Sequence, residues 1–302
     1  MMIITPSALS ALMTGFRADF QAGQGMAASQ YQQIATVIPS SSKSNTYGFL
    51  GQFPQFRKWV GARVVKDMAA HSYTITNEPF EATVGVDRDD IEDDNIGIYK
   101  PMMQELGRAS TVFPDELIFP LLDAGPTSLC YDGQNFFDAD HPVYPNVDGT
   151  GVAVSVSNYD DDGGSTAPMW FLLDTTRAIK PFIYQNRRSM QFMQMTDAKD
   201  EEVFTNKLYR YGVDCRANAG YGLWQMAYAS RKAITGANIW DAYKNMRGFT
   251  ADGGRKLGVK PNVLLVRGEH EEQAREAVKA IINGGETNTL SGLLTVMVAD
   301  WL

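Results

Sequence analysis

The dominant pattern in this sequence is a long helical one over residues 88–124. Apolar residues at three- and four-residue spacing supply one face that can pack on a core. Five carboxylates open the pattern, and they suit the positive end of a helix dipole. Three prolines interrupt it, and a proline inside a helix removes a hydrogen bond and bends or divides the helix. We therefore predict a long, interrupted, central helix. The carboxylates are Asp89, Asp90, Glu92, Asp93 and Asp94, and the prolines are Pro101, Pro114 and Pro120.

Strands and helices are mixed on both sides of this helix without a regular order. Alternation of apolar and polar residues from Trp59 to Asp87 predicts a long antiparallel hairpin that turns at residues 77–79. Two apolar runs predict a smaller hairpin around Thr175 and Thr176. Because a doubly wound sheet requires regularly alternating strands and helices, we expect an α+β fold. Strands are expected at 169–174, 179–185, 263–266 and 294–301, and helices at 7–20, 237–247 and 269–283.

Two segments ahead of the long hairpin are poorly suited to a core of their own. Residues 21–46 are rich in Gln, Ala, Gly and Ser, a composition that buries little, and they predict an arm that runs across another surface. Residues 49–60, FLGQFPQFRKWV, place four aromatic residues beside Arg57 and Lys58. Such a run is either local core or part of an interface, and the pattern alone leaves both open.

Size and composition limit the class of protein. The 302 residues, 44% hydrophobic and 21% charged, suffice for one large domain or two ordinary ones, which excludes disorder and fibres. No stretch offers the roughly 20 apolar residues of a membrane span. Two cysteines, Cys130 and Cys215, cannot form a disulfide framework, and they fit a reducing compartment. We expect a soluble chain that is not exported.

The net charge of −8 is unevenly distributed along the chain. Residues 1–75 hold six Lys and Arg against two Asp and Glu, residues 76–166 hold three against nineteen, and residues 167–302 hold eighteen against fourteen. The overall acidity argues against a dedicated nucleic-acid binder. The acidic middle block is either a solvated face or a surface that meets a basic segment of another subunit.

One cluster has residue types suited to catalysis: Asp132, Asp138, Asp140 and His141. Carboxylates hold divalent metals and a histidine can act as a base, so a metal-dependent hydrolase stands as the alternative function. Short polar side chains in a loop rich in Gly and Pro more often cap turns, and we favour that interpretation.

Other catalytic templates are missing from the sequence. It has no nucleophile elbow, phosphate loop, zinc-protease motif or calcium loop. The other histidines, His71 and His270, fall in different predicted elements, which does not favour a shared zinc site. Cys215 has no histidine near it in the sequence, and a buried structural cysteine is the favoured interpretation. We therefore expect no enzymatic activity and no cofactor.

An arm, a projecting hairpin and an acidic body without a catalytic site suggest a chain built to be held by copies of itself. Projecting segments gain stability by burying apolar surface on a neighbour, at ~25 cal/mol per Å². The basic segment 1–75 would then lie on the acidic block of an adjacent copy, with a strength that falls as salt rises.

Several long strings also resemble one known family, the major head subunit of Mu-like phages and prophages. They contain rare residues in context, such as Trp170 and Trp224, and they span nearly the whole chain. The strings are YGFLGQFPQFRKWVGAR (47–63), DDIEDDNIGIY (89–99), YDGQNFFDADHPV (131–143), PMWFLLDTTRAIKPFIYQNRR (168–188) and YGVDCRANAGYGLWQMAYAS (211–230).

The resemblance implies the Hong Kong 97-type tailed-phage capsid fold. It implies an N-terminal arm at 1–45, an extended β-hairpin loop at 46–87, a peripheral domain with a spine helix at 88–150, joined by 286–302, and an axial domain at 151–285. Copies would form hexamers and pentamers of an icosahedral virion shell around double-stranded DNA, assembled in the bacterial host cytoplasm. Partners would be the chain itself, a scaffold or protease, the portal and decoration proteins, without sequence-specific DNA binding and without a membrane.

The family transfers no catalytic residue, so the expected assembly contacts rest on physical grounds. Hydrophobic anchors are expected at Phe53, Phe56 and Trp59. Basic contacts are expected at Arg57, Lys58 and Arg63, with Asp89, Asp90, Glu92, Asp93 and Asp94 as their acidic counterparts.

Overall fold

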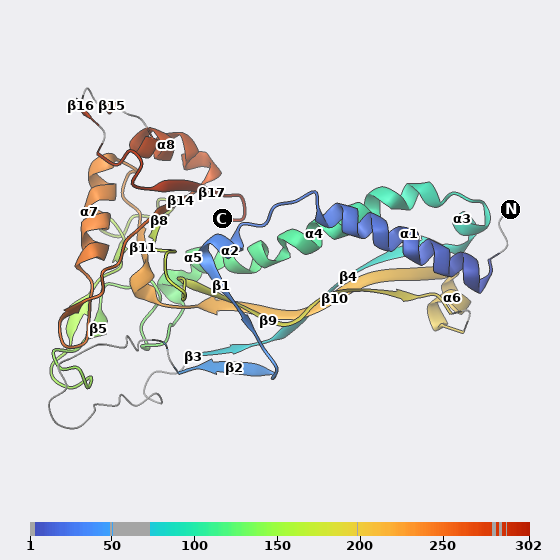
Figure 1. Ribbon diagram of the computed structural model, residues 1–302, viewed down its shortest axis with the longest axis horizontal. Helices are drawn as coiled ribbons and strands as arrows, with labels where there is room; N and C mark the ends of the chain where they lie inside the picture. Colours follow the sequence, from blue (N-terminus) through green and yellow to red (C-terminus); the bar gives the residue numbers. More distant parts are fainter. Residues whose placement is uncertain are drawn as a thin grey trace.

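The computed structural model describes residues 4–48, 50, 73–197, 199–279, 282–283, 286–287 and 289–302. The molecule is elongated, with a long limb of helices and strands at one end and a compact mixed unit at the other (Figure 1). Among the described residues, no helix combines the length and hydropathy that crossing a membrane requires.

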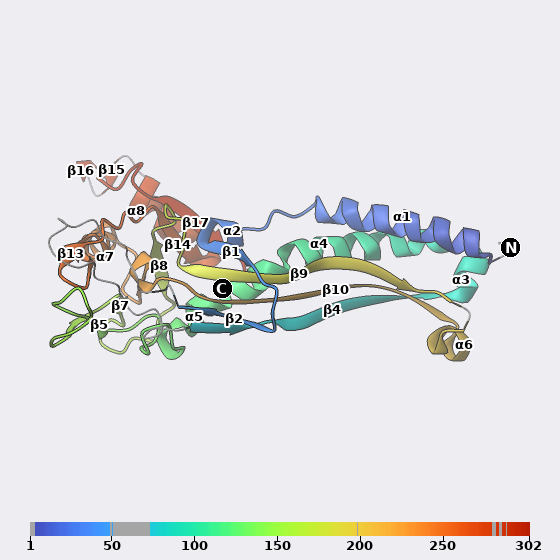
Figure 2. The ribbon, with the colours of Figure 1, turned by 60° about the horizontal axis from the view of Figure 1, so that its bottom comes forward.

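The limb is a four-stranded sheet with two helices stacked on one face. The turned view shows the helices on that face (Figure 2). The strand order is β1 (Ala35–Pro39), β9 (Phe182–Met195), β10 (Leu208–Tyr221) and β4 (Glu78–Asp87). Alternate residues of β10 are buried, from Tyr209 through Tyr211 and Val213 to Cys215, which is the period of a strand with one covered face. The covering helices are α1 (Pro6–Gln24) and α4 (Lys100–Ile118).

The two helices approach each other unusually closely, and glycine makes the approach possible. A Cβ added at Gly107 of α4 would lie 2.0 Å from the carbonyl oxygen of Phe20, and one added at Gly23 of α1 would lie 1.9 Å from that of Gln104. Because both obstacles are backbone atoms, no side-chain rotation would relieve the clash. The contact seats Phe16 of α1 on Tyr211 of β10, with ring centroids 4.9 Å apart.

The interrupted central helix is confirmed. It consists of α3 (Arg88–Glu92), the 3₁₀ turn η1 (Ile96–Tyr99), α4 and α5 (Pro120–Ala124). Pro101 and Pro120 stand in the first turns of α4 and α5, where no hydrogen bond is lost, and Pro114 lies inside α4. The Asp87 carboxylate caps α3 by accepting the backbone N–H of Asp89 at 2.8 Å.

The compact unit is built on a five-stranded sheet. Its order is β17 (Thr295–Ala299), β14 (Val263–Arg267), β8 (Trp170–Leu173), β11 (Ala227–Ser230) and β7 (Tyr159–Asp160). Helix α7 (Gly236–Gly248) contacts β8 and β11, and helix α8 (Glu271–Lys279) contacts β14 and β17. The helix expected at 237–247 and the strands expected at 263–266 and 294–301 are confirmed, whereas α8 is shorter than the expected 269–283.

Both expected hairpins are wrong in their pairing. The strand β3 (Tyr73–Thr76) pairs with β2 (Ser44–Tyr47), and β4 pairs with β10. Likewise β8 pairs with β11 and β14 in the compact unit, while β9 pairs with β1 and β10 in the limb. Apolar alternation reports that a segment is a strand, but it carries no information about which strand lies beside it.

The arm-like segment 21–46 does not project from its own chain. Tyr31 and Ile34, in α2 (Tyr31–Ile34), are buried in the largest core cluster, and β1 pairs in parallel with β9. The expectation that this stretch buries little is therefore wrong. Its few apolar residues are placed where the limb meets the compact unit, and composition averaged over the segment hides them.

Candidate functional site

The aromatic and basic assembly contacts expected at Phe53, Phe56, Arg57, Lys58, Trp59 and Arg63 lie outside the described residues. The chain on either side is well anchored. Tyr47 and Tyr73 are paired across β2 and β3, so the chain enters and leaves this segment at adjacent positions. The buried Tyr47 hydroxyl donates to Gln185 Oε1 at 2.6 Å, and this hydrogen bond fixes the β2–β3 pair to β9.

The expected acidic contacts lie at the far end of the limb, around α3 (Figure 1). Three of them have partners on their own chain: Asp89 with Lys207 at 3.3 Å, Glu92 with Arg88 at 2.9 Å, and Asp90 with the Tyr99 hydroxyl at 2.5 Å. Hydrogen bonds from Tyr99 and Asn95 lower the pKa of Asp90.

Asp93 and Asp94 differ from the other three acidic residues. Both are exposed, and no ion pair among the described residues involves them. They are the members of the cluster best placed to meet a cation from outside the chain.

The sequence cluster around His141 is a buried hydrogen-bonded group. His141 Nδ1 lies 2.8 Å from Asp132 Oδ2, and their side chains are 0% and 5% exposed. The Cys130 thiol donates to the other oxygen of Asp132 at 3.1 Å. The imidazole stacks on Trp224 with centroids 4.0 Å apart and planes 10° apart. These contacts join β5 (His141–Val143) and the loop before it to the 3₁₀ turn η3 (Trp224–Met226).

Asn158 determines which nitrogen of His141 carries a proton. The Asn158 Nδ2 group faces the carbonyl oxygen of Phe136 at 2.8 Å, so Oδ1 must be the acceptor on its other side. That oxygen accepts the backbone N–H of Asp138 at 2.9 Å and lies 3.2 Å from His141 Nε2. Nε2 is therefore a donor. Nδ1, which faces a carboxylate, needs either a second proton or a cation.

Electrostatics agree with a charged partner at Asp132. Burial opposes ionisation of this carboxyl, but the hydrogen bond and charge of His141 and the hydrogen bond from Cys130 outweigh it and hold the pKa of Asp132 below its ordinary value. Burial, together with the Asp132 carboxylate, raises the pKa of the Cys130 thiol.

The other two members of the proposed hydrolase set do not join this group. Asp138 accepts the backbone N–H groups of Asn135 and Ala139, at 3.1 and 2.7 Å, and Asp140 is exposed. The preference for a turn-capping role is thus confirmed for Asp138. Neighbouring positions in a loop need not point to one site, because each side chain follows its local backbone.

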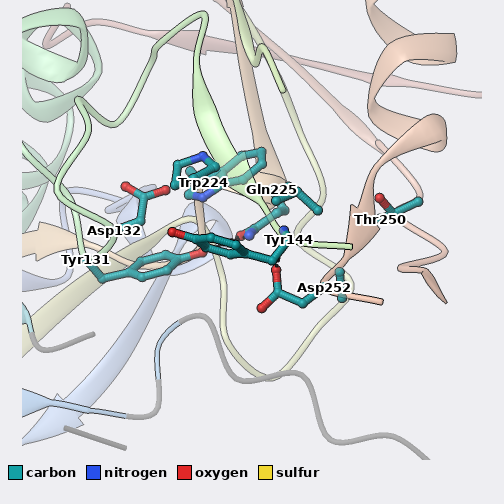
Figure 3. Close-up of a pocket in the computed structure, with 10 residues that line it drawn as sticks. Tyr131, Asp132, Tyr144, Trp224, Gln225, Thr250 and Asp252 are labelled. Atoms are coloured by element: carbon teal, nitrogen blue, oxygen red, sulfur yellow. Dashed lines mark hydrogen bonds between the residues drawn. The ribbon is translucent and has the colours of Figure 1, made fainter. Parts of the chain in front are cut away.

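A cavity of about 40 Å³ lies beside the group, walled by Asp132, Tyr131, Trp224, Gln225 and Tyr144 (Figure 3). That volume holds a few water molecules. It is far smaller than the roughly 300–1,000 Å³ of a pocket that takes an organic ligand.

Cys215 is buried on β10, and burial, followed by the neighbouring Asp214 carboxylate, raises the pKa of its thiol. A protonated buried thiol is a poor nucleophile. The structural role favoured for Cys215 fits this geometry.

Asp115 is a buried polar residue that sequence reasoning missed. It is 1% exposed on α4, and its carboxylate accepts the Ser29 hydroxyl at 2.9 Å and the backbone N–H groups of Gln30 and Tyr31 at 3.0 and 2.6 Å. These donors begin α2, so Asp115 caps that helix from another element and fastens the N-terminal segment to α4. Its only sequence signal is a carboxylate on the apolar face of the central helix.

Solved phage shells contain chains with the same architecture, a limb of a long helix on a long sheet joined to a compact unit. This chain matches a chain of the bacteriophage JBD30 procapsid with a TM-score of 0.88 and 52% identity, and the match covers 99% of this chain and 100% of the procapsid chain. A JBD30 capsid decorated with minor capsid protein trimers matches with a TM-score of 0.76 and 39% identity, over 100% of both chains. The fold is the Hong Kong 97-type, and the class is that of tailed-phage capsid proteins.

Sequence comparison identifies the family within this class. The model of the family described as Mu-like prophage major head subunit gpT matches residues 9–302. The major capsid protein of Escherichia phage Mu is 48% identical over 305 residues, covering 100% of both chains. The chain belongs to the Mu-like major head subunit family. It is a major capsid protein that assembles with copies of itself into the shell of the virion.

Proposed function

We propose that this chain is a purely structural shell subunit without catalytic activity. The burial of the His141 group, beside a cavity with room for only a few waters, is the observation that supports this. In this proposal the subunits form hexamers and pentamers in the bacterial host cytoplasm and enclose double-stranded DNA. An activity that depends on divalent metal and is lost in His141→Ala, in a chain that stays monomeric at high concentration under the electron microscope, would favour the hydrolase instead.

The proposal includes partners beyond the chain itself. A scaffold or protease and a portal would act in assembly, as the family resemblance implies. Decoration proteins are supported by the JBD30 capsid that carries minor capsid protein trimers. DNA would be held by closure of the shell, because a chain with a net charge of −8 offers little general attraction to phosphate.

The domain division is part of the proposal, with two revisions. The arm at 1–45, the extended loop at 46–87, the peripheral domain at 88–150 with 286–302 and the axial domain at 151–285 remain predictions. However, β9 and β10 form the limb sheet with β4, so we assign residues 182–221 to the peripheral domain. In turn, β17 pairs with β14 in the sheet of the compact unit, so we assign residues 295–299 to the axial domain.

We expect Trp59→Ala to reduce the yield of shells while the subunit stays folded. A buried aromatic anchor typically contributes about 2 kcal/mol or more to an interface, and each subunit of a shell repeats the loss. Sedimentation and electron microscopy measure shell yield, and circular dichroism checks the fold. Trp301→Ala removes another tryptophan, one that is 38% exposed, and serves as the matched control. If Trp59→Ala unfolds the subunit, Trp59 belongs to the core.

A contact between the basic residues of one subunit, including Arg57 and Lys58, and the exposed Asp93 and Asp94 of a neighbouring copy is part of the proposal, and it can be tested by a rescue. Arg57→Glu with Lys58→Glu should lower shell yield, most strongly at low salt, because like charges would then face each other. Adding Asp93→Lys and Asp94→Lys to the same chain should restore much of the yield. Asp161→Lys with Asp162→Lys changes an equally exposed acidic pair in the compact unit. Equal rescue by that control pair would show that only net charge matters.

A further inference from the structure

Three different metal-binding side chains converge in the loop that leads into β5 and at the first residue of that strand. The Cys130 sulfur, an Asp132 oxygen and the His141 Nδ1 nitrogen all lie within 4.8 Å of one another. All three side chains are buried, with Cys130 6% exposed and the other two at 5% or less. From this convergence we propose that Cys130, Asp132 and His141 bind a structural zinc ion. This proposal goes beyond the shell function and does not depend on it.

The orientation of His141 is that of a metal ligand. Metal-bound histidines usually donate their second ring N–H to a carbonyl or carboxylate, which fixes the tautomer. Here Asn158 Oδ1 lies 3.2 Å from Nε2. Asn158 is itself held, because its amide group donates to the backbone oxygens of Phe136, Trp224 and Ala227. The lone pair of Nδ1 is thereby directed at the Asp132 carboxylate, where a cation satisfies both groups.

The loop holds the Cys130 sulfur in place. Burial and the Asp132 carboxylate raise the pKa of the thiol, so the sulfur is protonated in the absence of a metal. The turn is closed by the Cys130 N–H to the Gln134 carbonyl at 2.8 Å, and it passes through Gly133 with φ of 85°, a conformation that suits glycine. Binding would displace the thiol proton, as zinc does at cysteine ligands.

The ligand atoms lie near one another, and side-chain rotations would bring them to the spacing of a tetrahedral site. Zinc bonds of about 2.0–2.3 Å place neighbouring ligand atoms roughly 3.3–3.7 Å apart. His141 Nδ1 lies 2.8 Å from Asp132 Oδ2 and the Cys130 sulfur lies 3.1 Å from Asp132 Oδ1, so the two contacts use different carboxylate oxygens. Zinc binding therefore requires the carboxylate to turn one oxygen toward the ion, and the sulfur and Nδ1, now within 4.8 Å of each other, to close on it. The mixture of sulfur, nitrogen and oxygen favours zinc over magnesium or calcium. Asp132 also lines the 40 Å³ cavity, which can hold a water as fourth ligand.

Metal analysis of the full-length chain, purified without chelator, tests the site. We expect about one zinc per chain in the wild type and in Cys215→Ser, which changes the other buried cysteine. We expect almost none in Cys130→Ser and in Asp132→Asn, a variant that keeps the shape of the side chain. After exchange for Co²⁺, the thiolate charge-transfer absorption should appear in the wild type and in Cys215→Ser and be lost in Cys130→Ser.

Two outcomes overturn the site. One is a wild-type chain that takes up no zinc when refolded with an equimolar amount of it, in which case a second proton on His141 pairs with Asp132. The other is zinc that stays bound in folded Cys130→Ser and Asp132→Asn, which would place the metal elsewhere. Shell formation is scored separately, so a failure of the zinc site is distinguishable from a failure of assembly.

Discussion

Gly107→Ala is expected to destabilise the subunit by about 3–5 kcal/mol, although alanine is the better helix former. The added methyl group would lie 2.0 Å from the Phe20 carbonyl oxygen, so α1 must move away from α4. That movement exposes Leu12, Phe16 and Phe20, each now at most 9% exposed. Burial of one such side chain is worth about 1.5–3 kcal/mol, and partial repacking recovers some of it.

Urea denaturation of the unassembled subunit measures this effect, and limited proteolysis within residues 6–24 reports whether α1 has separated. Gly15→Ala is the matched control, because it is the same substitution in α1 at a position with no atom within 4 Å of the new methyl group. It should stabilise the subunit by about 0.4–1 kcal/mol. If both variants are stabilised alike, α1 does not pack on α4 through Gly107.

Asp115→Ala is expected to cost about 3–4 kcal/mol and to loosen the start of α2. The substitution leaves the half-buried N–H of Gln30 and the buried N–H of Tyr31 without their acceptor, at about 1–3 kcal/mol for each unsatisfied group. Asp115→Asn keeps one acceptor oxygen and should lose less. The arm would stay folded in part, since α1 is seated independently through Gly23 and Gly107.

Hydrogen exchange at the Gln30 and Tyr31 amides gives a local readout, and urea denaturation gives the global one. Glu116→Ala removes the next carboxylate on the same helix, which is exposed, and it should change the free energy of unfolding by less than about 0.5 kcal/mol. Unchanged protection of the two amides in Asp115→Ala would show that the cap contributes nothing to the order of the arm.

The candidate site was only partly visible from the sequence. Asp132 and His141 lie close together in the sequence and have side chains that can bind metals or transfer protons, so the sequence indicates both. Asp138 and Asp140 meet the same two criteria, although their side chains do not join the group. Cys130 and Asn158 were missed, although they complete the group. Asn158 lies 17 residues from His141, and a lone asparagine after a short strand has no distinguishing pattern.

Periodicity, prolines and long family strings determined the α+β class, the divided central helix and the membership in the capsid family. These are properties of local backbone geometry and of residues in fixed order, which a linear chain records. Only the tertiary structure shows which strands pair and that residues 21–46 pack on their own chain. It also shows that Gly107 permits the close approach of α1, that Asp115 caps α2 and that Cys130 contacts Asp132. Each of those depends on atoms brought together from distant positions, and the spacing of residues along the chain does not record which distant positions meet.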